Sequence, residues 1–454
     1  MKMGNSSLGK SIFLPKSSSI RYRLMATAAN EAGGALSVKY YGKNVFIVSD
    51  PVLGRELHTK HASSLMRGGF PYKIVRTLVG VGPLTANGIE WLDYRQDLNP
   101  SLSESAVSPY LPTLVGSYAD LFNRWVELAR PGPISIRRDD ILHTVYSVVS
   151  RLVFGFKIDD TDLDKLFQVD SAKYLLVGKL LVSCVSSPFT LPSWIPFSQM
   201  GMLNKLCSES DKVLQRQLDI FYTRHGVSDP ASCILDTVYS ELTNRDRCPL
   251  DFRQKRELNL VKHLFLAATL TTGLALDWAL RVLSAKPHIY EVLQHEVDSL
   301  VGDDSSIPMA LPSLQNCRAF ILEVLRLYNP ATAVVKTVAC DISYSDGFVP
   351  RGSILITSIY GIHTNNFYWE DPFLFRPERF RLDSYPNDAY WPFFIGGHAC
   401  PGKILALSEL ISALVLILRR FKLVSQPFLN LNGIQLGPLM SASGTEPILL
   451  ELRT

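Results

Sequence analysis

The stretch FFIGGHACPG, residues 393–402, places a single cysteine, Cys400, between glycines and a proline. Glycines let a backbone approach a flat ligand closely, because they have no Cβ. Pro401 and the apolar run at 404–407 predict that a helix starts directly after the cysteine. A sulfur at a helix start faces the positive end of the helix dipole, which favours the thiolate, the form that binds metal. The stretch therefore predicts a metal ligand, with a small buried hydrophobe as the alternative interpretation.

The spacing of this stretch favours the ligand. One phenylalanine, two glycines and the cysteine repeat the pattern F-x-x-G-x-x-x-C-x-G at Phe393, Gly396, Cys400 and Gly402. This resembles the haem-binding loop of the cytochromes P-450. The resemblance implies a mainly α fold with a small mixed β-sheet, in which haem b lies between a long central helix and the cysteine-bearing helix. It also implies that Cys400 is the proximal iron ligand, with Phe393, Gly396 and Gly402 beside the haem.

Two motifs upstream follow the order of the same family. The family's E-x-x-R is matched by Glu323 and Arg326, which share a helical face and can pair. The apolar residues of 320–327 predict that the pair is buried, and a buried pair needs further hydrogen bonds. The family's P-E-R-F occurs at 377–380 and supplies Arg379. By resemblance, the three charged residues form a structural lock beneath the haem, whereas an ordinary surface ion pair is the alternative.

A third motif, W-x-x-x-R, occurs at Trp91 and Arg95. Residues four apart share a helical face, and both side chains can donate to a carboxylate. In the family this pair holds a haem propionate, and the alternative is a helix that packs through Trp91. His398 stands where the family most often has arginine, so we expect it to contact a propionate with a charge that depends on pH. Lys336 is expected to add a cation nearby.

The apolar stretch 261–283 predicts one long central helix that is hydrophobic on most faces. Within it, AATLTT at 267–272 resembles the family's (A/G)-G-x-(D/E)-T-(T/S). The match makes Thr271 and Thr272 the candidate catalytic residues of an oxygen pocket, and the Thr271 hydroxyl can bond the carbonyl four residues earlier. Leu270 replaces the family's acid, which helps to relay protons. The alternative is that these threonines only pack inside a core helix.

Composition bounds the domain organisation and the class of protein. A chain of 454 residues allows two or three domains. No Gly-, Ser- or Pro-rich linker divides it, so we predict a single domain over 35–454. Its net charge of +4 comes from mixed charges without a basic stripe, which argues against nucleic-acid binding. The seven cysteines include no C-x-x-C pair, which indicates a reducing compartment rather than disulfides or zinc.

Residues 1–34 are basic, rich in serine and nearly free of acids. We expect them to be a leader outside the domain, either disordered or a mitochondrial transit peptide. No apolar run there reaches the ~20 residues that span a bilayer. Residues 174–202 are very apolar, and by resemblance they roof the substrate cavity. They are either core or an exposed patch for peripheral membrane contact. The cytoplasm, the endoplasmic reticulum surface and mitochondria all stay open as locations.

The resemblance implies a haem-thiolate monooxygenase that inserts one oxygen atom of O2 into an apolar small molecule. A thiolate ligand pushes electron density toward bound dioxygen and favours O–O cleavage. The electrons would come from a separate partner, either an NAD(P)H-dependent reductase or a ferredoxin-type donor. Leu270 motivates a second hypothesis, an isomerase, dehydratase or peroxide-using enzyme of the same fold without the oxygen-activating cycle. A third hypothesis is a haem-binding sensor without turnover.

Overall fold

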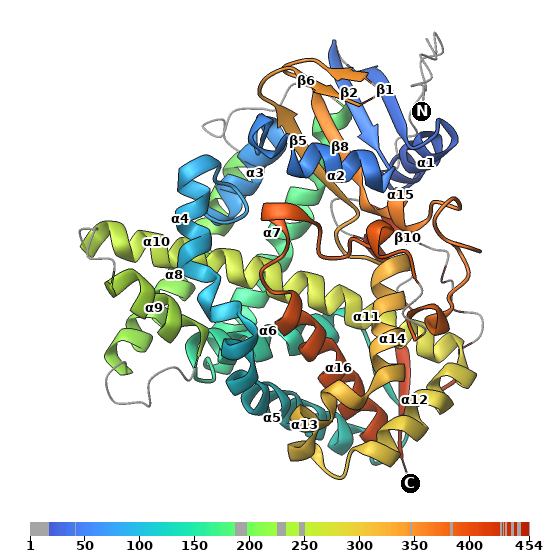
Figure 1. Cartoon of the computed structure of the whole chain (residues 1–454). Helices are drawn as coiled ribbons and strands as arrows, with labels where there is room; N and C mark the ends of the chain where they lie inside the picture. The colour runs from blue at the N-terminus through green and yellow to red at the C-terminus, as the bar shows by residue number, and fades with distance from the viewer. Residues whose placement is uncertain are drawn as a thin grey trace.

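The computed structural model describes residues 18–40, 42–186, 198–224, 233–244, 250–345, 347–381, 385–426, 429, 431, 434–436, 440–442 and 446–453. Most of these residues are helical, and the largest of the four described sheets lies at the top of Figure 1. The predicted mainly α fold with a small mixed sheet is confirmed. The part of the chain at 187–197, including most of the proline-rich end of the expected roof, lies outside the described residues.

The helices follow the amphipathic and apolar stretches of the sequence, and Figure 1 shows them packed in several directions around a central rod. The longer ones are α1 (Ser18–Glu31), α2 (Pro51–Thr59), α3 (Gly69–Val79), α4 (Gly88–Leu98), α5 (Glu104–Ala129), α6 (Arg138–Phe154), α7 (Asp160–Ser186), α8 (Gln199–Arg224), α9 (Ile234–Asn244), α10 (Leu250–Phe265), α11 (Thr271–Ala285), α12 (Pro287–Leu300), α14 (Gln315–Leu327) and α16 (Lys403–Arg420). The short helices are α13 (Ile307–Ala310) and α15 (Ile359–His363).

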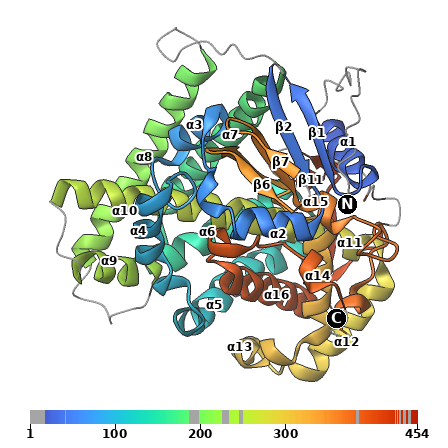
Figure 2. The same cartoon turned by 45° about the horizontal axis from the view of Figure 1, so that its top comes forward.

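The largest sheet is mixed and has the strand order β1-β2-β8-β5-β3. Strand β2 runs parallel to β8, and the other pairs are antiparallel. In Figure 2 the sheet comes forward and the β1–β2 hairpin stands beside α1. The strands are β1 (Ala35–Tyr40), β2 (Lys43–Val48), β3 (Leu65–Met66), β4 (Ile134–Ile136), β5 (Ala333–Val338), β6 (Ile342–Tyr344), β7 (Gly347–Val349), β8 (Ile354–Ser358), β9 (Phe421–Leu423), β10 (Ile434–Leu436), β11 (Met440–Ala442) and β12 (Ile448–Leu452).

The central rod differs from the single regular helix that we predicted over 261–283. It consists of α10, a π-helical turn over Leu266–Leu270 and α11, and it begins earlier than expected. A π-turn adds one residue to a helical turn, and such turns occur often at functional sites. Among the described helices, only Lys255–Ala285 is long and apolar enough to cross a membrane, and 72% of its most apolar window is buried in the protein. This helix is the core of the fold.

The expected leader enters the fold from Ser18 onward, whereas residues 1–17 lie outside the described residues. Helix α1 packs on β2 and α15. The side chain of Asn30 donates a hydrogen bond to the carbonyl of Gly361, and Ala26 and Ala29 are buried. Small side chains at these positions let the helix lie close to the sheet. Residues 18–34 are therefore built into the same body as the rest of the chain.

Candidate haem site

The loop that carries Cys400 folds back on itself before α16 begins. The backbone N–H of Cys400 donates to the carbonyl of Phe393 at 2.8 Å, and the N–H of Ala399 donates to the carbonyl of Gly396 at 3.1 Å. Gly396 has a φ of 67°, and a Cβ there would lie 3.1 Å from the carbonyl oxygen of His58, so the turn needs glycine. Helix α16 begins at Lys403, so Pro401 precedes the helix and does not occupy its first position as predicted.

Part of the Cys400 residue is exposed, although protein atoms also surround its thiol. Burial raises the pKa of its thiol, while the N–H of Gly402 and the Arg95 guanidinium lower it. The loop alone thus does not produce the thiolate that we expected from the helix dipole. A bound metal ion would supply the missing stabilisation, because cysteine binds metal as the thiolate and loses its proton on binding. Phe393 is half-buried and packs against the main hydrophobic core.

The π-turn and the start of α11 present a small, accessible face in an otherwise buried helix. Ala267 is exposed and Thr271 is half-exposed, whereas Thr269 and Thr272 are buried. The Thr271 hydroxyl donates to the carbonyl of Ala267, which is the back-bonding expected from the sequence. Helix α11 packs against α16, the helix that follows the cysteine loop. The helix that begins at the candidate oxygen-pocket residue therefore contacts the helix that follows the candidate ligand.

Four cationic or potentially cationic side chains gather around Trp91. The Arg67 guanidinium donates to Nδ1 of His398 at 2.9 Å and lies 5.8 Å from the Trp91 ring. The His398 ring lies 4.2 Å from the Trp91 ring. Arg95 donates to the carbonyl of Ala399 at 3.0 Å, which ties α4 to the cysteine loop. Burial, and then Arg67, lowers the pKa of Lys336 to about 7. We call Arg67, Trp91, Arg95, Lys336 and His398 the cationic cluster.

His398 differs from its expected behaviour. An arginine only donates, so the bond from Arg67 makes Nδ1 of His398 an acceptor and places the ring proton on Nε2. Burial, followed by Lys336 and Arg67, lowers the pKa of His398 to about 3. The imidazole is therefore neutral at physiological pH, and we correct our expectation that its charge varies there. Its Nε2–H can still donate to an acidic ligand.

The cationic cluster fits the acidic side of a haem. Among the described residues, no carboxylate pairs with Arg67, Arg95 or Lys336, although Lys336 is only 2% exposed. The indole N–H of Trp91 is buried without an acceptor. Buried charges and donors without partners are costly, so the arrangement calls for an anion with several acceptor oxygens. The two propionates of haem meet this need, which makes Trp91, Arg95 and His398 suitable for the role expected of them.

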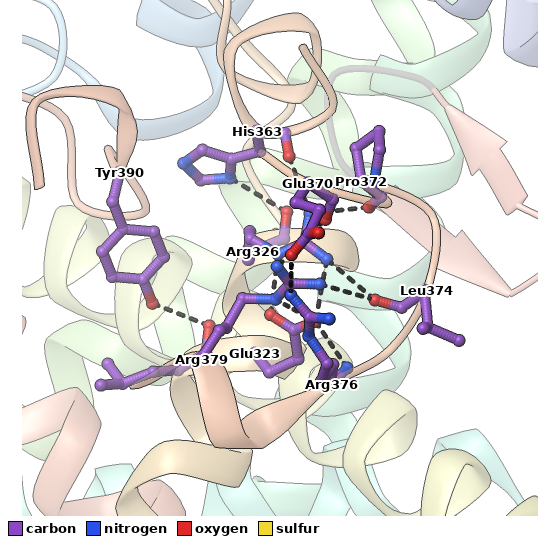
Figure 3. A network of polar contacts seen from close by, with 10 residues as sticks. Glu323, Arg326, His363, Glu370, Pro372, Leu374, Arg376, Arg379 and Tyr390 are labelled. Carbon is purple, nitrogen blue, oxygen red and sulfur yellow. Dashed lines mark hydrogen bonds and ion pairs between the residues drawn. The ribbon is translucent and has the colours of Figure 1, made fainter. Parts of the chain in front are cut away.

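The three charged residues of the expected lock meet in one network of polar contacts (Figure 3). Glu323 accepts two hydrogen bonds from Arg326, at 2.7 and 2.8 Å, and both side chains are fully buried. Arg379 lies 3.2 Å from Glu323. The remaining donors of Arg326 reach the carbonyls of His363, Pro372 and Leu374. The pair thus has the extra partners that a buried ion pair requires.

His363 extends this lock toward the loop before the cysteine, and sequence reasoning missed it. Its Nδ1 donates to the carbonyl of Arg326 at 3.0 Å, and its Nε2 accepts from the N–H of Trp391 at 2.8 Å. Both bonds require a neutral ring. Burial, and then the Arg326 charge, lowers the pKa of His363 to about 3. Nothing in the local sequence marks His363, because its two partners, Arg326 and Trp391, come from two other segments of the chain.

This buried imidazole predicts that stability depends on pH. In the unfolded chain His363 takes a proton below its ordinary pKa of 6.5, whereas the folded protein resists this until about pH 3. The unfolded state then binds more protons, so stability falls as pH falls through that window, by up to about 1.4 kcal/mol per pH unit. We expect His363→Gln to flatten this slope in denaturant unfolding of the haem-loaded protein. Equal slopes in both proteins would contradict the assignment.

Arg67 is the second functional residue that the sequence did not reveal. It follows β3, and Asn87 clamps its backbone from both sides, at 2.7 and 2.9 Å. Its guanidinium also donates to the carbonyl of Ala86 at 2.8 Å. No motif surrounds Arg67 in the sequence. Only the pairing of β3 with β5 brings it near Lys336 and the cysteine loop.

The fold and this site define a haem-thiolate protein. The chain belongs to the cytochrome P450 family, whose model matches residues 6–452. Haem is therefore its cofactor, and the chain is an oxidoreductase of a family that uses O2, a redox partner and a small-molecule substrate.

Individual relatives are distant but cover most of the chain. Cytochrome P450 4A2 of Rattus norvegicus is 27% identical over 388 residues, which cover 79% of this chain and 73% of that protein. Cytochrome P450 4A11 of Homo sapiens is 25% identical over 414 residues, which cover 87% of this chain and 76% of that protein. The crystal structure of the cytochrome P450DA heme domain has a TM-score of 0.78 at 19% identity and covers 95% of this chain and 92% of that chain.

Proposed function

We propose that this chain is a monooxygenase that inserts one oxygen atom of O2 into an apolar small molecule, with Cys400 as the proximal iron ligand. The observation that carries the proposal is an exposed Cys400 in the loop that the uncompensated cationic cluster contacts, together with an accessible face at Ala267 and Thr271 in the helix that packs against α16. When bound, the haem supplies the activation of O2, and the cysteine thiolate increases its electron density.

The residues of the chain have distinct roles in this proposal. Trp91, Arg95 and His398, together with Arg67 and Lys336, would hold the propionates and orient the haem. Gly396 and Gly402 would leave room for the porphyrin, since neither carries a side chain. Phe393 packs on the core and so fixes the start of the loop, and its carbonyl accepts from the N–H of Cys400. The lock of Glu323, Arg326 and Arg379 would fix the segment that holds this loop.

The apolar substrate is supported by a second, smaller hydrophobic cluster that touches the π-turn. Helices α3, α7 and α8 supply its buried members, and Leu266 of the π-turn packs against them. Val334 and Val335 on β5 keep part of their surface exposed. Binding of an apolar ligand there would expel water from the Thr271 side. The cluster's buried residues are Ile74, Leu78, Val79, Leu176, Val177, Leu180, Met200, Leu203 and Cys207.

Reconstitution tests this function directly. The purified haem protein is screened for substrate-induced changes of its absorption spectrum, and each ligand found is incubated with NADPH and an added reductase, or with a ferredoxin and its reductase. We expect a hydroxylated product that depends on O2, on reduced cofactor and on one of these electron donors. Ligands that bind but are never oxidised with either donor would contradict the proposal.

We expect Thr271→Ala to divert electrons from product to hydrogen peroxide. The Thr271 hydroxyl is the polar group on the accessible face of the helix, and its loss removes a hydrogen-bond donor and acceptor beside the reacting oxygen. The ratio of product to consumed NADPH should fall about tenfold or more, within the range of general acid effects. Ser284→Ala is the control, because Ser284 is buried near the end of the same helix. Unchanged coupling in Thr271→Ala would remove Thr271 from the mechanism.

Leu270 supports a second candidate function. Leucine cannot donate the proton that an acid at this position supplies, so an enzyme of this fold could instead rearrange or dehydrate a hydroperoxide. Such an enzyme needs neither an electron donor nor O2. Turnover of an organic hydroperoxide under argon, without NADPH or reductase, would favour this candidate over the monooxygenase.

A further inference from the structure

A chain of buried polar side chains starts on α8 and crosses α7 to α6. The Ser210 hydroxyl donates to Oδ1 of Asp170 at 3.0 Å, and the Lys173 ammonium donates to the same oxygen at 2.5 Å. The Tyr146 hydroxyl donates to Oδ2 of Asp170. Asp170 and Lys173 are 2% and 4% exposed. Because a buried ion pair is costly to form, its presence in an apolar core needs a reason.

The chain continues from Tyr146 to the π-turn of the central helix. The hydroxyls of Tyr146 and Tyr174 lie 3.1 Å apart, and Tyr174 is hydrogen-bonded to the side chain of Thr269. The Thr269 hydroxyl donates in turn to the carbonyl of Phe265. Burial, and then the Asp170 charge, raises the pKa of both tyrosines well above the ordinary value, so both keep their protons. We call Ser210, Asp170, Lys173, Tyr146, Tyr174 and Thr269 the buried polar row.

The outer end of the buried polar row, Ser210, is buried next to residues of α8 that line a surface cleft. Ser210 precedes Asp211, and Asp211 lines a surface cleft of about 520 Å³ together with Cys207 and Ser208. Lys262 of α10 pairs with Asp211 at 2.8 Å at the same place. The cleft therefore reaches Asp211, the residue that follows the first hydroxyl of the row in the sequence.

The inner end lies in the one turn of the described central helix that is π-helical. Thr269 is on the buried side of this turn, and Thr271 is on its accessible side. Between them stands Leu270, where the family pattern has an acid. The helix thus lacks a carboxylate at position 270. The Asp170 carboxylate, however, is connected to the same turn through the hydroxyls of Tyr146 and Tyr174. A network with a purely structural role would not need to end at Thr269, next to position 270, where the family pattern has an acid.

We propose that the buried polar row delivers protons from the cleft at α8 to the π-turn and so replaces the acid that Leu270 lacks. The inference rests on the monooxygenase function proposed above, whose balance is RH + O2 + 2 e⁻ + 2 H⁺ → ROH + H2O. The electrons come from the redox partner, and the row supplies the protons. These residues act through Thr271 and are relay residues, not catalytic ones.

Each transfer conserves protons along the row. Asp170 accepts a proton from Lys173 or, through Ser210, from water in the cleft, and passes it to the oxygen of Tyr146. The Tyr146 hydroxyl, whose proton points to Asp170 in the structure, turns toward Tyr174 as it receives the new proton and passes its own proton there; Tyr174 then passes one to Thr269. The last transfer, from Thr269 to the hydroxyl of Thr271 two residues on, would need a bridging water as part of the proposal. The hydroxyls then rotate back, and the row is reloaded from the cleft.

The test uses Tyr174→Phe and Asp170→Asn in the haem-loaded enzyme with its substrate and reductase. We expect both variants to keep the haem spectrum and the substrate-induced spectral change. The yield of product per NADPH should fall about tenfold, with a matching rise in peroxide. The matched control is Tyr290→Phe. It also removes one buried hydrogen bond, which the Tyr290 hydroxyl donates to the carbonyl of Phe421 at 3.1 Å, outside the buried polar row. Should Asp170→Asn fail to fold, Ser210→Ala takes its place.

A second readout does not depend on turnover. The C–O stretching frequency of the reduced carbon monoxide complex responds to hydrogen bonds near the ligand. We expect it to shift between H2O and D2O in the wild-type protein and in Tyr290→Phe, and to lose this shift in Tyr174→Phe. Unchanged coupling and an unchanged isotope shift in Tyr174→Phe would overturn the relay while leaving the proposed function intact. A wild-type enzyme without O2-dependent product would instead overturn the proposed function.

Discussion

We expect Cys400→Ala to eliminate the thiolate-type Soret band of the reduced carbon monoxide complex and all O2-dependent turnover. Alanine offers no ligand atom, so any haem that still binds must take water or an imidazole as its axial ligand. The electron density that a thiolate provides for O–O cleavage is then lost. The cationic cluster stays intact in this variant, so some haem should be retained. The measurements are the reduced carbon monoxide difference spectrum and product formation with reductase.

Cys340→Ala is the matched control for this substitution. Cys340 is also an exposed cysteine, and its thiol donates to the Ser64 hydroxyl at 3.0 Å. We expect its spectrum and its activity to equal those of the wild type. A thiolate-type band that survives in Cys400→Ala, or that disappears in Cys340→Ala, would reject the assignment of Cys400 as the ligand.

Arg326→Met should cost about 3–5 kcal/mol of stability, the usual result of breaking a buried ion pair from one side. Methionine keeps much of the volume but leaves the Glu323 carboxylate with only Arg379 as a charged partner. It also removes the donors to three backbone carbonyls, and each unsatisfied group adds a desolvation cost. Denaturant unfolding of the haem-loaded protein measures the loss, and the yield of haem-containing protein should fall with it.

Arg376→Met is the control for this prediction. The Arg376 side chain pairs with the exposed Glu370 at 2.9 Å, in the same segment as the lock. Its backbone N–H, which donates to Glu323 at 2.8 Å, is unaffected by the substitution. Exposed ion pairs contribute little, so we expect an unfolding curve close to that of the wild type. Equal stability losses in Arg326→Met and Arg376→Met would show that the lock is no more important than a surface pair.

The sequence predicted correctly those contacts whose partners lie close together in the chain. Thr271 bonds the carbonyl of Ala267, four residues away, as the helical period predicted. The pairing of Glu323 with Arg326 follows equally from local spacing. By contrast, the π-turn was not foreseen, because apolar periodicity does not distinguish a π-turn from an α-turn. The early start of the domain at α1 was also missed, because a serine-rich, basic composition outweighed the buried alanines of its helix.

The chain itself determined the ligand loop, the two arginines of the lock and the threonine face, since each is a short pattern whose chemistry depends on neighbours one turn away. Only the tertiary structure assembled the cationic cluster, the His363 bridge and the buried polar row. Arg67 lies 331 residues from His398, and Tyr146 lies 24 residues from Asp170. Burial also reversed two local expectations, since it neutralises His398 and raises the pKa of the Cys400 thiol. The physical reason is that solvation and charge depend on everything packed around a group, which a linear pattern does not specify.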